Sequence, residues 1–460
     1  MSIDDRYHVI QGPLAERLAT IRRLSFIVGI LALAACLALG LIFGFQQFLK
    51  SYYIGFLFWL GLPLGCIGLL LLNHLASGTW GLLLRRPLEA GAATLPLLTV
   101  LFVPIALNID QIYPWAGAEG PPGAHGDKHY AKGEVQEHEH VDEPDDRAMP
   151  RRLAFGAEAP PMGTADEIVK RGNKEIYFDL PFFFGRAIGF FVVWNLLAWI
   201  LNRWSDQQDR TTDPAPSRRL SLLGAPGLIL LFLTGSFAMF DWVMSLEPDW
   251  YSTIYGMMLI TGMALQTFAF VIATTTLLAD RGEMQGLPTP ARFRDLGNLL
   301  LAFVMLWAYM NYSQFIIIWN GDLIEEIPWY LRRTSHGWQY VALALIVFHF
   351  FLPFFVLLFR GNKERTDRLR WVASAVFLMH LVDIFWLTAP ALGYRDLGIS
   401  LLDPLAVAGI GGLWLGVYTY VLGSKPLLSA NDPALVELRE HDQGNDHHHR
   451  HQEGPDDGRA

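Results

Sequence analysis

Ten long apolar runs constrain the fold of this chain more than any other feature of its sequence. A helix needs about 20 residues to cross a hydrocarbon core about 30 Å thick, and backbone groups that face lipid must be satisfied within their own segment. The runs also lack the alternation of polar and apolar residues that is typical of a membrane β-barrel. The sequence therefore predicts an all-α, polytopic integral membrane protein with transmembrane helices near residues 24–45, 53–75, 91–113, 181–202, 222–245, 254–279, 295–319, 339–359, 369–388 and 401–422.

Polar segments divide these runs into five parts. A cytoplasmic N-terminal segment (1–23) precedes three helices (24–113), a long loop (114–180) leads to seven more helices (181–422), and a disordered cytoplasmic tail (423–460) follows. The loop is rich in Pro, Gly, Glu and Asp, a composition that cannot bury a core of its own, so we expect it to be partly disordered or held by a partner. Histidines occur in both the loop and the tail, but their spacing matches no closed site, so we predict no metal centre.

The distribution of lysine and arginine predicts the orientation in the membrane. With the N-terminus placed in the cytoplasm and the long loop left out, eighteen basic residues fall on the cytoplasmic side and four on the other. Both termini are then cytoplasmic, and the long loop and the segment 247–253 lie outside. The four basic residues on the outer side are Lys50, Arg332, Arg333 and Arg395.

The segment 240–253 carries acids at the end of an apolar run, where membrane insertion makes them costly. An ionised carboxylate within a spanning segment is usually paired, turned to a wet cavity, or functional. Asp241 is such an acid, and Ser245 lies four residues on, hence on the same face of a helix. Arg186, within the boundary of the fourth run, could extend to the outer surface or pair with an acid.

A second group of ionisable residues lies on the eighth and ninth runs. His349 and His380 each lie about ten residues into runs of opposite direction, so we expect them at a similar depth in the membrane. Asp383 follows His380 by three residues and shares its helical face. Asn311 and Gln314 on the seventh run are as well explained by helix–helix contacts as by a polar pathway. His74 ends the second run at the cytoplasmic side.

Two runs share a pattern that suggests an internal repeat. The fifth run ends in Asp241-Trp242 and the ninth in Asp383-Ile384-Phe385-Trp386, and four runs separate the two motifs. Tandem four-helix bundles, made of runs two to five and six to nine, would produce this spacing.

Several stretches together resemble a known family. They are 53–65 with Asn73 and His74, 236–256, 306–309 with 327–333, and 383–386. They are similar to the large membrane subunits of bacterial alternative complex III, a quinol:electron-acceptor oxidoreductase, within the NrfD-like polysulfide-reductase membrane-anchor superfamily. The resemblance implies a ten-helix, cofactor-free subunit of the bacterial inner membrane. It also implies a paralogous membrane subunit, an iron–sulfur subunit and c-type cytochrome subunits as partners, and a role in quinone binding or in proton movement.

Three hypotheses for function follow. In the first, ionisable groups line a quinol-proximal or proton-conducting path, because quinol oxidation must release two protons with its two electrons. In the second, His349 and His380 are the axial ligands of a b-type haem. In the third, the chain is a structural anchor for peripheral redox subunits. The residues of the proposed path are Asp241, Ser245, His380, Asp383, His349, Asn311, Gln314 and His74.

Overall fold

The computed structural model describes residues 12–76, 80–117, 176–279 and 287–428, together with Met284, Asn431, Asp432 and Leu435. This part of the chain contains helices and no strand, and ten of its helical segments are long and apolar enough to span a membrane. The predicted all-α, ten-span fold is therefore confirmed. Most of the predicted loop, residues 118–175, and most of the predicted tail lie outside the described residues.

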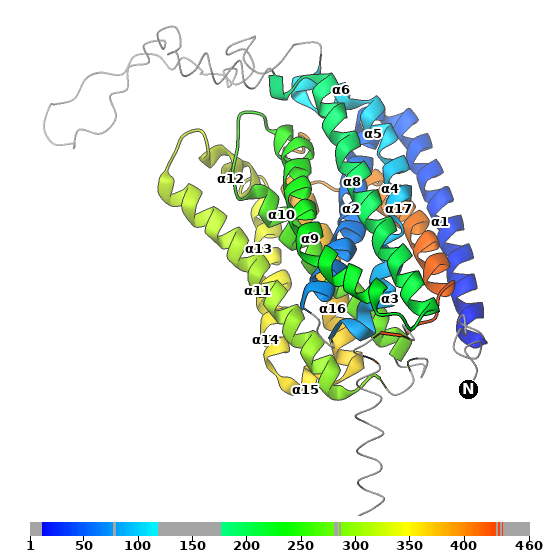
Figure 1. Cartoon of the computed structure of the whole chain (residues 1–460). Coiled ribbons are helices and arrows are strands. Elements are labelled where there is room, and N and C mark those ends of the chain that lie inside the picture. Colours follow the sequence, from blue (N-terminus) through cyan, green and yellow to red (C-terminus); the bar gives the residue numbers. More distant parts are fainter. Residues whose placement is uncertain are drawn as a thin grey trace, which may run out of the picture.

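The spans run nearly parallel to one another (Figure 1). In chain order they are α1 (Pro13–Phe43), α2 (Phe45–Ala76), the broken third span, α8 (Leu180–Arg210), α9 (Ala215–Trp242), α10 (Tyr255–Ala279), α11 (Pro290–Gly321), the broken eighth span, α16 (Thr366–Thr388) and α17 (Leu402–Gly423). The third span consists of α3 (Trp80–Ala92), α4 (Leu95–Leu101), α5 (Val103–Leu107) and α6 (Ile109–Ile112), and the eighth of α13 (Trp338–Ala344), the π-helix η4 (Leu345–Phe351) and α14 (Leu352–Leu358). Short helices lie in the connections: η2 (Pro114–Ala116), η3 (Met244–Leu246), α12 (Ile327–Arg333) and α15 (Arg360–Lys363).

The third span begins earlier than the sequence predicts. We expected it at 91–113, with Arg85 and Arg86 in a cytoplasmic loop, but the helix begins at Trp80 and buries both arginines. Burial is tolerated because both guanidinium groups are paired with acids, as described below. Pro96 and Pro104 then interrupt the span, since a proline has no N–H to donate to the preceding turn.

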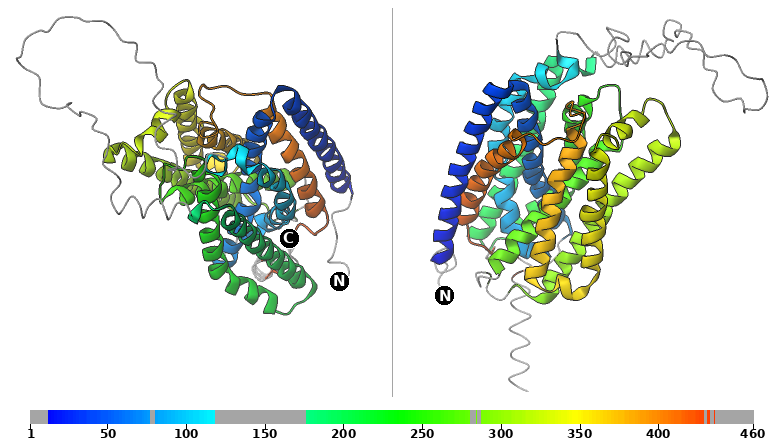
Figure 2. Two further views of the ribbon diagram at one scale, coloured as in Figure 1. Left: turned by 90° about the horizontal axis from the view of Figure 1, so that it is seen from above. Right: turned by 180° about the vertical axis from the view of Figure 1, so that it is seen from behind.

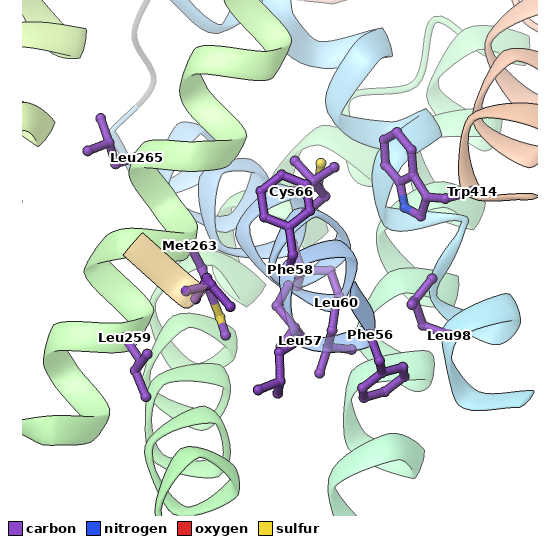
Figure 3. Close-up of a cluster of buried hydrophobic side chains, with 14 of the residues drawn as sticks. Phe56, Leu57, Phe58, Leu60, Cys66, Leu98, Leu259, Met263, Leu265 and Trp414 are labelled. Carbon is purple, nitrogen blue, oxygen red and sulfur yellow. The ribbon is translucent and has the colours of Figure 1, made fainter. Parts of the chain in front are cut away.

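The spans pack as two bundles side by side. One contains α2, the third span, α8 and α9, and the other contains α10, α11, the eighth span and α16, in agreement with the predicted repeat. α2 and α10 also pack against each other at the centre, so they are the most buried spans. Side chains of α2 point outward in several directions, toward Leu259 and Met263 of α10, Leu98 of α4 and Trp414 of α17 (Figure 3).

α1 and α17 flank the first bundle, as Figure 2 shows from above and behind. Their contact depends on glycine, because a Cβ atom added to Gly412 would lie only 2.5 Å from the Cα of Gly29. Such small residues let membrane helices approach closely. Glycines of α2 have the same use, since Gly61 and Gly65 pack against Gln266 and Thr267 of α10.

The two ends of the molecule differ in their number of basic residues. Each end is named by one of its residues. The Glu247 end holds α6, α12 and the α9–α10 connection, and the Arg85 end holds the start of α3 and α15 (Figure 1). The distribution of basic residues predicts that the Glu247 end faces outward and the Arg85 end faces the cytoplasm.

Candidate functional site

His349, His380 and Asp383 come together inside the second bundle and form what we call the His349 site. All three side chains are buried, and one ligand-type atom of each lies within 4.8 Å of the others. The imidazole centroids are 6.0 Å apart, and Nδ1 of His380 is 3.4 Å from Oδ2 of Asp383. The prediction that the two histidines lie at a similar depth is therefore confirmed.

A π-helix places His349 at this position. In a regular helix its carbonyl would accept a hydrogen bond from residue 353, but that residue is a proline and has no N–H. The wider π turn of η4 avoids this missing partner, and such turns occur frequently at functional sites. Pro353 thus accounts for the irregular turn that carries His349.

Neighbouring side chains fix the orientation of the other two groups. The indole N–H of Trp307 on α11 donates a hydrogen bond of 2.9 Å to Oδ2 of Asp383. The Trp307 ring also meets the His349 ring edge to face, with centroids 4.4 Å apart. On the other side, His380 packs on Gly262 of α10, where an added Cβ would lie 2.7 Å from Cε1 of the imidazole. A side chain at position 262 would therefore displace the histidine.

Five polar atoms of the His349 site have no hydrogen-bond partner within the part of the chain that the structure describes. They are both ring nitrogens of His349, both of His380, and Oδ1 of Asp383. The 3.4 Å contact between His380 and Asp383 is within ion-pair range but does not meet the geometry of a hydrogen bond. A buried polar atom left unpaired costs about 1–3 kcal/mol, so this cluster is expensive for a structure that uses it only for packing.

The packing around the imidazoles bears on the haem hypothesis. Trp307, Phe58 and the backbone at Gly262 contact the two rings closely. These contacts occupy the space beside the imidazoles, which a macrocycle between two axial ligands would need.

Asp241 lies at a second place, in the first bundle, where it pairs with Arg186. Nε of Arg186 is 2.7 Å from Oδ2 of Asp241, and Nη2 is 3.1 Å from Oδ1. Of the two alternatives for Arg186, pairing with an acid is the one observed. The hydroxyl of Tyr177 also donates to Oδ1, at 2.5 Å. Burial and the nearby Asp241 charge raise the pKa of the Tyr177 hydroxyl, so it remains a donor.

The remaining residues of the predicted path do not join these two sites. Ser245 donates to the backbone carbonyl of Asp241, and Asn311 to the carbonyl of Trp307. Gln314 accepts a hydrogen bond from Ser252 of the α9–α10 connection at the Glu247 end. His74 ends α2 near the opposite end. Among the described residues, no continuous chain of direct hydrogen bonds runs from Asp241 to His74, so a single path through all of these residues stays a prediction.

A buried ionic network closes the Arg85 end. Arg85 and Arg86 both pair with Glu89, and Arg86 pairs further with Asp209 of α8. Nη1 of Arg85 also lies 2.6 Å from Oδ2 of Asp432. The segment after α17 was expected to be a solvated tail, but Asn431 and Asp432 bond to this network and Leu435 is buried.

Sequence reasoning missed the cluster around Glu247. The carboxylate pairs with Arg332 and Arg333, and the Arg333 guanidinium, which is fully buried, stacks 3.8 Å above the ring of Trp329. The sequence did indicate such a pairing. Basic residues are rare on the predicted outer side, and the adjacent Arg332 and Arg333 there need an acid as a partner. Trp307 carried no such signal, since a tryptophan in an apolar run is typical of packing.

No protein-family model matches this chain, and no curated protein is detectably similar to it.

Proposed function

We propose that this chain is a membrane subunit of a respiratory quinol:acceptor oxidoreductase, corresponding to the F subunit of alternative complex III, and that its His349 site exchanges protons during turnover. The observation that carries the proposal is the set of buried, unpartnered nitrogens of His349 and His380 beside Asp383. The quinol context rests on the family resemblance of the stretches quoted above.

The chemistry of the site suits proton exchange. A neutral imidazole has one donor and one acceptor nitrogen, and a carboxylate has only acceptors, so the three groups can pass a proton among them by changing tautomer. Quinol oxidation releases two protons, and groups held in low-dielectric surroundings are the ones whose proton affinity responds to neighbouring charge. Quinone or quinol is therefore the ligand class that fits this function.

Electrons would leave through partner subunits. The sequence has two cysteines, Cys36 and Cys66, and no Cys-x-x-Cys-His motif for covalent haem attachment. The partners in this proposal are a paralogous membrane subunit, an iron–sulfur subunit and c-type cytochrome subunits. The proposed location is the bacterial inner membrane, with the Arg85 end in the cytoplasm.

The direct test is Asp383→Asn in the assembled complex. This change keeps the size of the side chain and an acceptor for Trp307, but removes the ionisable group. We expect quinol:acceptor turnover to fall by roughly 100-fold, the lower limit for loss of a positioned acid or base. Asp367→Asn is the matched control, because Asp367 lies on the same helix and is exposed. Wild-type turnover of the Asp383→Asn complex would refute the proposal.

A structural anchor is the second candidate function, favoured by the buried ionic network at the Arg85 end. On this alternative, the polar groups serve only packing. Deletion of 116–170 in the long loop, most of which lies outside the described residues, would then abolish assembly with the peripheral subunits. Substitutions of Asp383, His349 and His380 would leave turnover unchanged.

A further inference from the structure

The three side chains of the His349 site also form a ligand set for a single metal ion. One ligand-type atom from each of His349, His380 and Asp383 lies within 4.8 Å of the others, and each residue is at most 2% exposed. In a tetrahedral zinc site, bonds of about 2.0–2.2 Å place neighbouring ligand atoms about 3.4 Å apart. The three groups therefore need to approach one another by at most about 1.4 Å, which rotations of their side chains can supply.

Two elements in contact present these ligands. His380 and Asp383 are three residues apart on α16, so they lie on one face of that helix, and His349 lies on η4, which packs against α16. Helical bundles build metal sites in the same way, with a histidine and a carboxylate at this spacing on one helix and further ligands on a facing helix. The arrangement is therefore one that a metal ion can use.

The hydrogen bonds around the site leave one potential ligand atom of each side chain available. Trp307 donates to Oδ2 of Asp383, which orients the carboxylate, and Oδ1 has no hydrogen-bond partner in the described part of the chain. Both nitrogens of each imidazole also lack one there. One ion would bind three of these five atoms and so offset part of the cost of burying them. A donor to the carboxylate is also the usual support of a protein metal site.

The kinds of ligand atom select the kind of ion. Imidazole nitrogen suits Zn²⁺ and neighbouring transition metals, whereas Mg²⁺ and Ca²⁺ take mainly oxygen ligands. Two imidazole nitrogens and one carboxylate oxygen are also a known set of three protein ligands for zinc. A single ion needs none of the space beside the imidazoles that Trp307 and Phe58 occupy and that a haem would require.

We propose that the His349 site binds one divalent transition-metal ion of the Zn²⁺ class, through one nitrogen of His349, one nitrogen of His380 and Oδ1 of Asp383. The binding does not depend on the proposed function. Its effect on turnover does rest on that function, because the ion and a proton compete for the same lone pairs, so the ion is an inhibitor and not a resident cofactor. All three ligands are buried, so the ion enters through a transient opening of the bundle and binds slowly.

The zinc retained by the purified, assembled complex tests this proposal. The complex is incubated with Zn²⁺ alone, weakly held ions are removed by a short wash with a chelator, and the remaining zinc is measured by elemental analysis. His349→Gln and Asp383→Asn each remove one ligand from the site. His336→Gln is the matched control, because His336 is an exposed histidine between α12 and α13. A parallel incubation with Mg²⁺ controls for the kind of ion.

We expect wild type and His336→Gln each to retain one zinc ion per chain more than His349→Gln and Asp383→Asn, and no such difference with Mg²⁺. Zinc bound elsewhere in the complex is the same in all four proteins and cancels in the comparison. If one of the two site variants fails to assemble, the other still carries the test. Equal zinc contents in all four proteins would overturn the proposal.

Turnover separates this inference from the proposed function. We expect zinc to lower the turnover of wild type and His336→Gln gradually, by roughly 100-fold, as for the loss of a positioned acid or base, and the chelator to restore it on long incubation. Zinc retained at the site with no change in turnover would support the metal site and refute the proposed function. Equal zinc contents together with a slow Asp383→Asn complex would refute the metal site and support the proposed function.

Discussion

Asp241 and Arg186 form a buried ion pair whose contribution is mainly structural at rest. The Asp241 side chain is inaccessible, and it receives two hydrogen bonds from Arg186 and one from Tyr177. Removing one partner of such a pair leaves an uncompensated charge, whereas replacing both by apolar residues is often neutral. The guanidinium also packs over Tyr177 and Phe182, which ties the start of α8 to the end of α9.

A double-mutant cycle separates these effects. We expect Asp241→Leu or Arg186→Met alone to destabilise the protein by about 3 kcal/mol, and the double variant to recover most of that loss. Thermal unfolding of the purified complexes in detergent measures the stability of the single variants and of the double variant. Additive losses in the double variant would show that the two residues act independently, contrary to the observed pair.

Among individual residues, the sequence predicted ionisable groups better than their partners. The depth of His349 and His380 followed from counting residues into two runs, because helix rise is constant. The partner of Arg186 could not be chosen from the sequence. A guanidinium that extends to the surface and one that pairs with an acid both avoid an isolated charge within the membrane. The donor to Asp383 was missed because the indole of Trp307 is indistinguishable from a packing residue until the fold brings α11 against α16.

The π-helix η4 is the element on which the His349 site depends. It lies between α13 and α14, and Pro353 removes the donor that a regular helix would need there. The wider turn rotates His349 relative to a regular helix and directs it at His380. Runs of apolar residues reveal a span but not such a local change, so the sequence predicted the eighth helix without its irregular turn.

The variant Pro353→Ala tests whether the shape of this helix matters for turnover independently of protein stability. Alanine restores the N–H and favours a regular helix, so we expect unfolding temperature to stay the same or rise. Turnover should nevertheless fall by roughly tenfold, because His349 moves away from its partners. Unfolding temperature and turnover are measured on the same preparation. A variant as active as wild type would show that the π turn does not matter for function.

At the scale of the whole molecule, two bundles place one acidic site each at different depths. Asp241 is in the last turn of α9, and Asp383 is more than a turn from the end of α16. The corresponding basic partners lie on the third helix of each bundle, Arg186 on α8 and His349 on the eighth span. The repeated Asp-Trp motif predicted this duplication, but the sequence did not reveal that one copy holds an ion pair and the other a cluster of unpaired groups.

The Arg85 end shows how a segment outside the bundles completes the fold. Asp432 neutralises part of the charge of Arg85, whose side chain is 3% exposed. We expect a chain that ends after residue 430 to lose about 1–3 kcal/mol of stability, the cost of leaving a buried charged group underpaired. A chain that ends after Leu435 keeps the contact and serves as control. Equal unfolding temperatures of the two truncations would contradict the role of this segment.

Infrared difference spectroscopy of the assembled complex tests most directly whether the His349 site exchanges protons. A protonated carboxyl group absorbs separately from a carboxylate, so quinol oxidation should change a carboxyl band in the wild type and in Asp367→Asn. That band should be absent in Asp383→Asn. A difference spectrum that is identical in all three proteins would contradict the account, because Asp383 would then keep one protonation state throughout turnover.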